Sequence, residues 1–506
     1  MLLVALFVIG YLAIVFEHPL KLNKAASALV TGVACWTAYI FTGDAAVING
    51  QLAHHMGELS QILFFLLGAM AIVELIDAHD GFEIITNRIR TTNRRKLLVT
   101  VALLAFVLSA VLDNLTASIV MMSLVRKLVS GDGDRMYYGG VVIIAANSGG
   151  AWSPIGDVTT TMLWIGGQIT TTSVMSHVFL PSFISLAVPL LWIGRRMQGD
   201  VMRYGLQPED ITVATPPSMS GSTAFRLPKD AAAVGRTLAQ INLRGRTGLS
   251  VVNIVRNDVA ADVSPDGVLR AGDVLELSGT SEAIALGLNL LINGVAPKRT
   301  TAAERRSIFA CGIGVLLFVP IFKTVTHLPP FMGMLLGLGA LWVWTEVLHK
   351  TKTNESKSAL SVAGALQRVD AQSVLFFLGI LLAIGALQSR GTLAALARLM
   401  DETIGNVDVI TVSIGLLSAI VDNVPLVAAA QGMYSLSTFP ADHNFWLFLC
   451  YCAGTGGSIL IIGSAAGIAV MGIQRITFGW YVRHLSLPAL LGYAAGALTY
   501  VALAAR

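Results

Sequence analysis

The stretch Leu108–Met121, LSAVLDNLTASIVM, places Asp113 and Asn114 in the middle of an otherwise apolar run. A carboxylate inside hydrocarbon is costly and usually marks an ion path, a proton relay or a substrate site. Basic residues lie on both sides of the run, with Arg94 before it and Arg126 after it. Both ends are therefore cytoplasmic, and each apolar arm is shorter than the ~20 residues of a span. We predict a re-entrant hairpin at about 97–127 with Asp113 at its tip.

The same motif occurs a second time in the chain. LSAVLDNLT, at Leu108–Thr116, is echoed by LSAIVDNVP, at Leu417–Pro425. The second copy again carries an Asp-Asn pair, Asp422 and Asn423, within apolar sequence. We therefore interpret the chain as two copies of one membrane unit.

The composition excludes a soluble globular protein. Of the 506 residues, 55% are hydrophobic and only 13% are charged, and the mean hydropathy is +0.71. These values are typical of a polytopic helical membrane protein. The net charge of +4 comes from basic residues at the ends of apolar runs, so nucleic-acid binding has no support. The four cysteines lie in apolar segments, which argues against a disulfide or zinc framework.

Length and the lack of internal charge predict spans along both halves of the chain. In the first half they are 2–17, taken as a retained first span and not a signal peptide, 26–42, 59–76, an interrupted span at 138–170, and 177–193. In the second half they are 307–326, 331–347, 372–388, a hairpin at about 408–440, a break at 452–467, and 485–503. Lys21 and Lys24 place the first loop inside, whereas 43–57 lacks Lys and Arg and is predicted to be an outside loop.

Two glycine-rich breaks interrupt the spans that follow the hairpins. The first is ANSGGAWSPIGDVTTT, at Ala146–Thr161, whose glycines and proline cannot continue a lipid-facing helix. The second is CAGTGGSILIIGSAAG, at Cys452–Gly467, where an offset of 307 residues relates Gly156 to Gly463. Half-helices that meet near the midplane direct positive N-terminal ends and free carbonyls at one point, as in the ion sites of secondary transporters.

The repeated pattern also predicts how the two halves are oriented. Each half contains five crossings and one hairpin, and an odd number of crossings gives the halves opposite orientations. Inverted repeats with broken helices at the midplane are typical of secondary transporters. The predicted fold class is an all-α polytopic membrane protein of two inverted repeats, each with five crossings, a re-entrant hairpin and a broken helix, and with a small α+β cytoplasmic insert.

The insert is visible as a change of character from about residue 195 to 300. Prolines and serines come first, followed by short strands separated by Gly-Asp and Asp-Gly turns. GRTLAQINLRGRTGLSVVNIVRND and SPDGVLRAGDVLELSGTSEAI resemble the C-terminal subdomain of potassium-transport regulators (TrkA-C or RCK-C type). The resemblance implies a module that is often regulatory, and a folded linker without a ligand is the alternative. The predicted domains are a first membrane repeat at 1–194, a linker at 195–221, the module at 222–295 and a second membrane repeat at 296–506.

A likeness to a known family covers nearly all of the membrane part. It rests on FFLLGAMAIVELIDAHDGFEII (Phe64–Ile85), LDNLTASIVMM (Leu112–Met122) and AANSGGAWSPIGDVTTTMLW (Ala145–Trp164), which resemble the NhaD-type sodium/proton antiporters of the ion-transporter superfamily. Dicarboxylate carriers of that superfamily have neutral hairpin tips, whereas this chain has Asp113 and Asp422 there. The resemblance therefore implies exchange of a cation for protons, and the TrkA-C-like insert is a departure from the antiporter pattern.

The candidate ion- and proton-binding residues are oxygen-bearing or amide side chains in the hairpins and breaks, because hard cations prefer oxygen ligands. They are Asp113, Asn114, Thr116, Asn147, Ser148, Asp157, Thr159, Thr160, Asp422, Asn423, Thr455 and Ser458. The predicted Na⁺ ligands among them are Asp113, Ser148, Asp157 and Asp422. The structural alternatives are a buried acid at a turn, a helix N-cap at Asp157, and ordinary interhelical hydrogen bonds for Ser and Thr.

Glu74 and Asp77 are secondary candidates near the inner end of the third span. Snorkelling or pairing with Arg88 or Arg90 is the simpler interpretation of both.

These features favour a secondary active transporter, not an enzyme, that exchanges Na⁺ or Li⁺ for H⁺ by alternating access in the bacterial cytoplasmic (inner) membrane, with no cofactor. The alternative is a sodium-coupled carrier of a small anion, of the dicarboxylate or arsenite type, because helix N-termini also hold anions. A receptor or channel gated by the module is a third hypothesis. Besides the transported ions, the expected partners are the lipid bilayer, a second copy in a homodimer, and a small-molecule regulator at 222–295.

Overall fold

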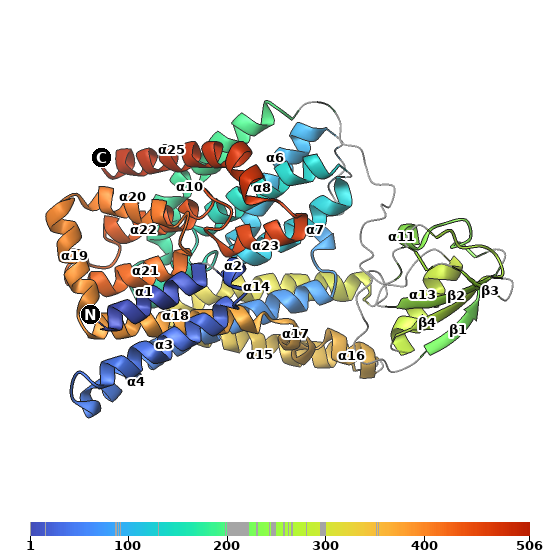
Figure 1. Ribbon diagram of the computed structural model, residues 1–506, viewed down its shortest axis with the longest axis horizontal. Helices are drawn as coiled ribbons and strands as arrows, with labels where there is room; N and C mark the ends of the chain where they lie inside the picture. Colours follow the sequence, from blue (N-terminus) through green and yellow to red (C-terminus); the bar gives the residue numbers. More distant parts are fainter. Residues whose placement is uncertain are drawn as a thin grey trace.

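The computed structural model describes residues 2–15, 17–86, 89, 91, 93–129, 131–197, 199, 222–228, 231–241, 243, 249–256, 259–261, 263–264, 267–279, 281–293, 300–350, 352 and 354–505. The described chain forms a large assembly of helices with a small sheet beside one of its ends (Figure 1). Both chain termini lie at the opposite end of the helical assembly (Figure 1).

The helices of the first half follow the predicted order. They are α1 (Leu2–Val15), α2 (Glu17–Leu20), α3 (Lys24–Ile40), α4 (Ala45–Ala78), α5 (Glu83–Thr86), α6 (Arg94–Ser109), α7 (Asn114–Leu128), α8 (Asp132–Gly150), α9 (Val158–Ile165) and α10 (Thr171–Gly194). Helices α6 and α7 form the first hairpin, and a non-helical stretch separates α8 from α9. The predicted hairpin and broken helix are therefore present in this half.

The second half repeats this order. Its helices are α14 (Ala302–Thr326), α15 (Pro330–Leu348), α16 (Asn354–Leu360), α17 (Val362–Arg368), α18 (Ala371–Ser389), α19 (Thr392–Thr403), α20 (Val407–Leu417), α21 (Asn423–Met433), α22 (Asn444–Gly456), α23 (Ala465–Gln474), α24 (Phe478–Tyr481), the π-helical turn η2 (Val482–Ser486) and α25 (Leu487–Ala504). Helices α20 and α21 form the second hairpin, and α22 and α23 are the second broken helix. The all-α polytopic fold is confirmed, and the order of its helices repeats in the two halves.

Equivalent contacts in the two halves show how closely the repeats match. In the first half, the Ser109 hydroxyl at the hairpin donates to the carbonyl of Ala146 at 2.6 Å. In the second half, the Ser418 hydroxyl donates in the same way to Ala453 at 3.0 Å. The repeats also pack on each other, with α3 against α18, α4 against α15, and α10 against α25. The hairpin and broken helix of each half therefore form the same substructure twice.

Three features of the helical part were not predicted. The predicted loop at 43–57 is helical from Ala45 onward, because Asp44 caps α4 by accepting from Ala46 N at 2.7 Å and the helix then runs unbroken. Helices α16, α17 and α19 are short or amphipathic, so they lack the apolar length that identified the spans. At 34 residues, α4 is about 50 Å long and exceeds the ~30 Å hydrocarbon core.

Six helices of the described chain are long and apolar enough to cross a membrane. They are Ala45–Ala78, Thr171–Gly194, Ala302–Thr326, Pro330–Leu348, Ala371–Ser389 and Phe478–Ala504. Their outward faces carry large exposed side chains such as Val343, Val325 and Leu498, as expected for contact with lipid. The chain is a multi-pass membrane protein.

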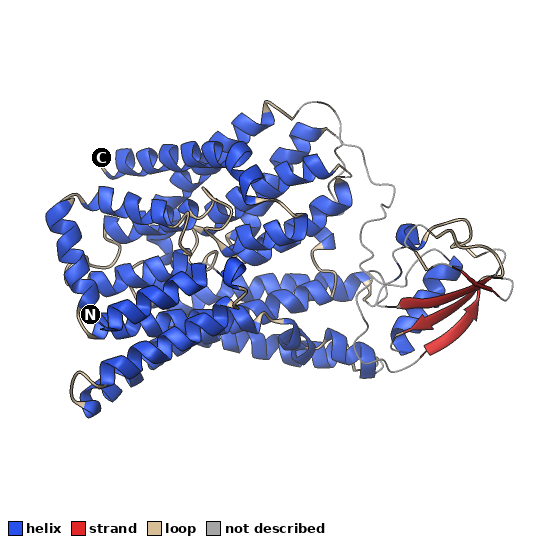
Figure 2. Ribbon diagram, viewed as in Figure 1, coloured by secondary structure: helices blue, strands red, loops and turns tan. Residues whose placement is uncertain are grey.

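The insert is a small α+β module (Figure 2). Its strands, β1 (Ser222–Arg226), β2 (Ser250–Arg256), β3 (Val259–Ala261) and β4 (Val274–Ser278), form an antiparallel sheet in the order β1-β4-β2-β3, with α11 (Leu238–Ile241) and α13 (Ser281–Asn293). At the end of β2, the Arg256 guanidinium donates to the buried Asp273 carboxylate at 2.7 Å and lowers the pKa of that carboxyl. The sheet is compatible with the predicted insert, the TrkA-C resemblance stays a prediction, and most of the linker 195–221 lies outside the described residues.

Glycines allow the hairpin and the broken helix of each repeat to touch through their backbones. A methyl group at Gly149 would lie under 3.0 Å from the Phe106 carbonyl oxygen, and one at Gly456 would meet the Gly415 carbonyl oxygen as closely. We expect Gly149→Ala and Gly456→Ala each to destabilise the protein by about 1–3 kcal/mol through overpacking. Gly472→Ala is the control, since a methyl group there meets nothing within 4 Å. Thermal unfolding in detergent measures the effect, and equal midpoints for all three variants would contradict it.

Candidate functional site

Four helix N-termini converge inside the helical assembly. The first residue or N-cap of α7, α9, α21 and α23 takes part in one buried set of hydrogen bonds. The N-caps are Asp113, Asp157, Asp422 and Ser464. Aspartate and serine are preferred N-caps because their oxygens accept from the free amides of the first turn. The convergence brings four positive helix ends and three carboxylates close together.

Asp157 is the centre of this set and is only 1% exposed. The Asn114 amide nitrogen donates to one of its carboxylate oxygens at 2.7 Å, and the Asn423 amide nitrogen donates to the same oxygen at 3.2 Å. The backbone amide and the hydroxyl of Thr159 both donate to the other oxygen at 2.9 Å. Each hairpin therefore contributes an asparagine to one carboxylate, which makes Asp157 the meeting point of the repeats.

A second pair of bonds extends the network. Asn147, at the end of α8, accepts from the Asn114 amide at 3.0 Å and donates to the Ser464 hydroxyl at 3.0 Å. Asn147 and Asn114 belong to the first repeat, whereas Ser464 caps α23 of the second repeat. All of these side chains are buried, so their polar atoms depend on each other for hydrogen bonds.

Asp113 and Asp422 lie near Asp157. Asp113 accepts from the Thr116 backbone amide at 2.9 Å and from its hydroxyl at 2.5 Å, whereas Asp422 accepts from the backbone amide of Val424 at 3.3 Å. Both are close enough to Asp157 for their charges to act on it. Asp422 also interacts electrostatically with Lys24 on α3. The two hairpin carboxylates are therefore near the centre but outside the direct hydrogen bonds of Asp157.

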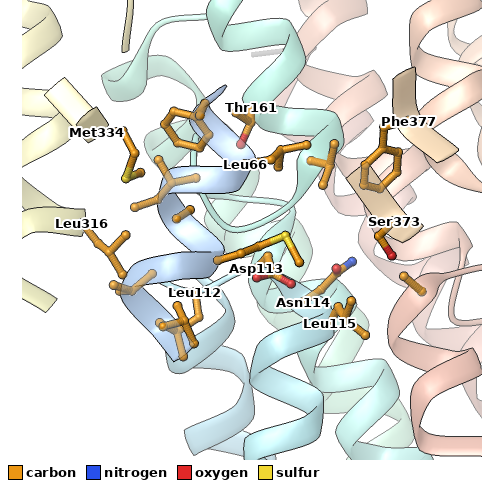
Figure 3. A pocket seen from close by; sticks show the side chains of 18 residues that line it. Leu66, Leu112, Asp113, Asn114, Leu115, Thr161, Leu316, Met334, Ser373 and Phe377 are labelled. Carbon is orange, nitrogen blue, oxygen red and sulfur yellow. The ribbon is translucent and has the colours of Figure 1, made fainter. Parts of the chain in front are cut away.

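A pocket reaches Asp113 from one side (Figure 3). Its walls come from α4, α14, α15 and α18, from the first hairpin, and from α9 and α23; in Figure 3, Asp113 and Asn114 lie between Leu316 and Met334 at one edge and Ser373 and Phe377 at the other. The empty space is about 700 Å³, open solvent at its mouth included. Asp113 therefore lies where a mostly apolar cavity meets the polar centre.

Several other predicted residues form hydrogen bonds outside the Asp157 network. The Thr160 hydroxyl donates to the Asp157 backbone carbonyl at 2.8 Å. The Ser148 hydroxyl pairs with Ser185 on α10 at 2.8 Å and so joins two helices. Thr455 and Ser458 bond to carbonyls of their own segment, Tyr451 and Thr455 respectively. The ion-binding role predicted for these four residues stays a prediction.

Glu74 and Asp77 lie toward the C-terminal end of α4. Glu74 faces Arg368 of α17 at 3.5 Å, so its cationic partner comes from a helix that was not predicted. Arg88 and Arg90 lie outside the described residues. The sequence analysis offered pairing with an arginine as the simpler interpretation of Glu74, and the ion pair with Arg368 agrees with it.

Ser464 was missed in the sequence, although a signal for it existed. The 307-residue offset relates Ser464 to Asp157. Each of the two residues directly follows the last glycine before the second half-helix, Gly463 and Gly156 respectively. The same offset places Gly454 opposite Asn147. The repeat therefore supplies the central carboxylate once only, and the site is asymmetric although the backbone around it is repeated.

The donors to Asp157 define the chemistry of the site. Asn114, Asn423 and Thr159 are neutral, so they stabilise a negative charge without cancelling it. A buried carboxylate with no positive partner is costly, and the cost is avoided when it takes up a proton or a metal cation. The amide and hydroxyl oxygens around it are ligands of the kind that a hard cation prefers. The arrangement can hold either a proton or a small cation at Asp157.

Comparisons with known proteins place the chain among membrane transporters. The model of the citrate transporter family CitMHS matches residues 11–447. The chain is 41% identical over 500 residues to sodium/proton antiporter 1 of Arabidopsis thaliana, covering 98% of this chain and 71% of that one. It is 40% identical over 497 residues to sodium/proton antiporter 2 of that plant, covering 98% of both chains. The Na⁺/H⁺ antiporter NhaD of Vibrio cholerae is 26% identical over 520 residues, with 96% of this chain and 88% of that one covered.

The contact between Asn147 and Ser464 predicts an energetic coupling between the repeats. We expect Asn147→Ala and Ser464→Ala to be non-additive in thermal stability, with a coupling of about 1 kcal/mol, because each substitution removes the other's partner. Asn147→Ala combined with Ser458→Ala is the control, since Ser458 bonds within its own segment. Additive effects in the first pair would show that the hydrogen bond does not link the repeats.

Proposed function

Because the chain belongs to the citrate transporter (CitMHS) family, together with the sodium/proton antiporters that match almost its whole length, we propose that it exchanges Na⁺ or Li⁺ for H⁺ by alternating access. The observation that carries the proposal is the position of Asp157, a buried carboxylate that accepts hydrogen bonds from asparagines of both hairpins. A proton or a cation satisfies this carboxylate, and the two compete for the same oxygens. The competition alone couples their movements in opposite directions.

The surrounding asparagines support two states of the site. In the structure the Asn114 and Asn423 amide nitrogens face Asp157, which suits the carboxylate without a bound cation. A cation at Asp157 repels these donors, so each amide has to turn its oxygen inward and become a ligand. Thr159 already holds one carboxylate oxygen through two donors and keeps the other directed toward the asparagines. Asp113 and Asp422, whose charges reach Asp157, then add to the attraction for the cation.

The pocket supports access from one side at a time. It reaches Asp113 between the hairpin and the helices α4, α15 and α18, whereas Asp422 is not among its lining residues. Rocking of the hairpins and broken helices against these helices would open the Asp422 side instead.

The anion carrier remains the second candidate because the matching family model is that of citrate transporters. Four helix N-termini at one point also suit an anion. However, three of the four already have an aspartate as N-cap, so an incoming carboxylate would face like charges. The N-caps therefore favour a cation over an anion.

The setting of the protein follows from the same proposal. We place it in the cytoplasmic membrane of a bacterium as a homodimer, with the 222–295 module on the cytoplasmic face as a binding site for a small-molecule regulator. The basic residues that flank the first hairpin support this orientation, because cytoplasmic loops are enriched in Lys and Arg. The fold of the module, a sheet with its own apolar core, supports an autonomous regulatory domain.

Asp157→Asn, Asp113→Asn and Asp422→Asn are expected to reduce sodium-driven proton movement to background while the protein still inserts in the membrane. Asparagine caps a helix as well as aspartate does, so the fold is kept and only the exchangeable charge is lost. The measurement is the dequenching of a pH-sensitive dye in everted vesicles after addition of NaCl or LiCl.

Asp44→Asn is the matched control, because Asp44 is also an N-cap but is exposed and far along the chain from the site. It should exchange like the wild type. Wild-type exchange in the Asp157→Asn variant would contradict the proposal. Uptake of labelled citrate or succinate by the wild type, with no cation-dependent proton movement, would favour the anion carrier.

A further inference from the structure

Two histidines form a buried pair away from the ion site. His79 follows the last residue of α4 and His349 follows the last residue of α15, and their exposed fractions are 0% and 1%. Their Nε2 atoms are 2.8 Å apart. The start of α14 covers the pair, with the Thr300 hydroxyl donating to the His79 carbonyl at 3.2 Å. The pair therefore joins three helices where the chain re-enters the helical part after the module.

The hydrogen bonds determine which nitrogens carry protons when both rings are neutral. His79 Nδ1 lies 2.7 Å from the carbonyl oxygen of Leu75, which only accepts, so His79 Nδ1 is protonated. Its Nε2 is then the acceptor, and the hydrogen in the Nε2–Nε2 contact belongs to His349. A neutral imidazole carries one N–H, so Nδ1 of His349 has a lone pair and no hydrogen.

That lone pair faces a carboxylate. Glu304 Oε1 is 3.8 Å from His349 Nδ1, and this buried nitrogen has no hydrogen-bond partner among the described residues. The other carboxylate oxygen, Oε2, accepts from the Thr301 backbone amide at 2.8 Å and from Lys352 Nζ at 3.0 Å. Two acceptors thus face each other, and one added proton between them would convert the gap into a charge-assisted hydrogen bond.

We propose that His349 is the binding site for one regulatory proton, separate from the transported protons, and that the bound proton is shared with Glu304. Uptake of the proton completes a continuous chain of hydrogen bonds from Leu75 through His79 and His349 to Glu304. These hydrogen bonds connect the C-terminal ends of α4 and α15 to the first turn of α14.

The charges that act on His349 are balanced: Glu304 and Glu346 are acidic, and Lys352 and Lys357 are basic. The helices that end at the pair or pack against those helices also carry Arg305 on α14, Lys350 after α15, Arg368 on α17, Glu74 and Asp77 on α4, and Asp80 and Glu83 after it. Glu346 is paired with Lys357, Glu83 with Arg305, and Glu74 with Arg368. The carboxylate that faces the unprotonated Nδ1 of His349 is Glu304. Burial lowers the pKa of His349, so the site fills as the pH falls below neutrality.

The site is mechanically connected to the pocket beside Asp113. Leu66 and Met70 of α4 and Met334 of α15 line that pocket, and the histidine pair joins the C-terminal ends of these two helices. A proton at His349 strengthens the hydrogen bond to His79 and so the link between two helices that line the pocket. We therefore expect the protonated state to slow transport under acidic conditions.

The first test does not depend on transport. In full-length protein labelled with ¹⁵N-histidine, NMR at pH 7.5 should show the Nδ1–H tautomer for His79 and the Nε2–H tautomer for His349. On acidification His349 should become doubly protonated, and Glu304→Gln should move its titration down by about one pH unit. Glutamine keeps the capping box at the start of α14, so the helix is retained. The Nδ1–H tautomer for His349, or titration unchanged by Glu304→Gln, would overturn the proposal.

The second test measures the pH profile of sodium-driven proton movement in proteoliposomes, and it rests on the proposed function. Glutamine can replace the Nε2–H donor of His349 but cannot bind the proton, so His349→Gln should retain activity about one pH unit further into the acidic range. His327→Gln, after the opposite end of α14, is the control and should keep the wild-type profile. A wild-type profile for His349→Gln would show that the proton has no effect on transport and would overturn that part of the proposal.

Discussion

The rest of the helical assembly depends on how the charge of Asp157 is held in the interior. A carboxylate of 1% exposure survives there because three neutral residues donate hydrogen bonds to it: Asn114 and Asn423, on opposite hairpins, through their side-chain amides, and Thr159 through its hydroxyl and backbone amide. This requirement explains why the hairpins turn where they do and why α8 and α22 break. Only helix starts place several free amides and cap side chains around one point. The two repeats are joined by a polar contact as well as by apolar packing.

The backbone repeats, but the chemistry of the centre does not. Asp157 corresponds to Ser464 and Asn147 to Gly454, whereas Asn114 corresponds to Asn423. A second carboxylate in place of Ser464 would add its repulsion to that already exerted on Asp157 by Asp113 and Asp422. One acid at this position, with an asparagine from each hairpin, avoids the added repulsion and still lets both halves respond to what the acid binds. The duplicated sequence thus gives both halves the same backbone arrangement, and the differences between the two copies leave a single central binding site.

Much of this could be predicted from the sequence, and the failures have physical reasons. The hairpins and breaks were found because polar and glycine-rich motifs are conspicuous in apolar sequence, and Asp113, Asp157 and Asp422 were recognised for the same reason. Helices α16, α17 and α19 lack that contrast. Ser464 was missed because a lone serine in a small-residue stretch is unremarkable until the fold places it beside Asn147. The Ser148 hydroxyl faces Ser185, and which face of α8 it occupies is decided by packing that no local pattern encodes.

The glycine contacts at Phe106 and Gly415 limit where the molecule can deform. Where two backbones are in direct contact, no side chain can change rotamer to accommodate a shift. The hairpin and the broken helix of each repeat therefore move as one rigid body. Gating must then occur along surfaces filled by flexible side chains, such as the methionines that α4 and α15 direct toward Asp113. Methionine side chains change rotamer at low energetic cost. The cavity wall can therefore deform while the hairpin and the broken helix on one side of it, and α4 and α15 on the other, keep their shapes.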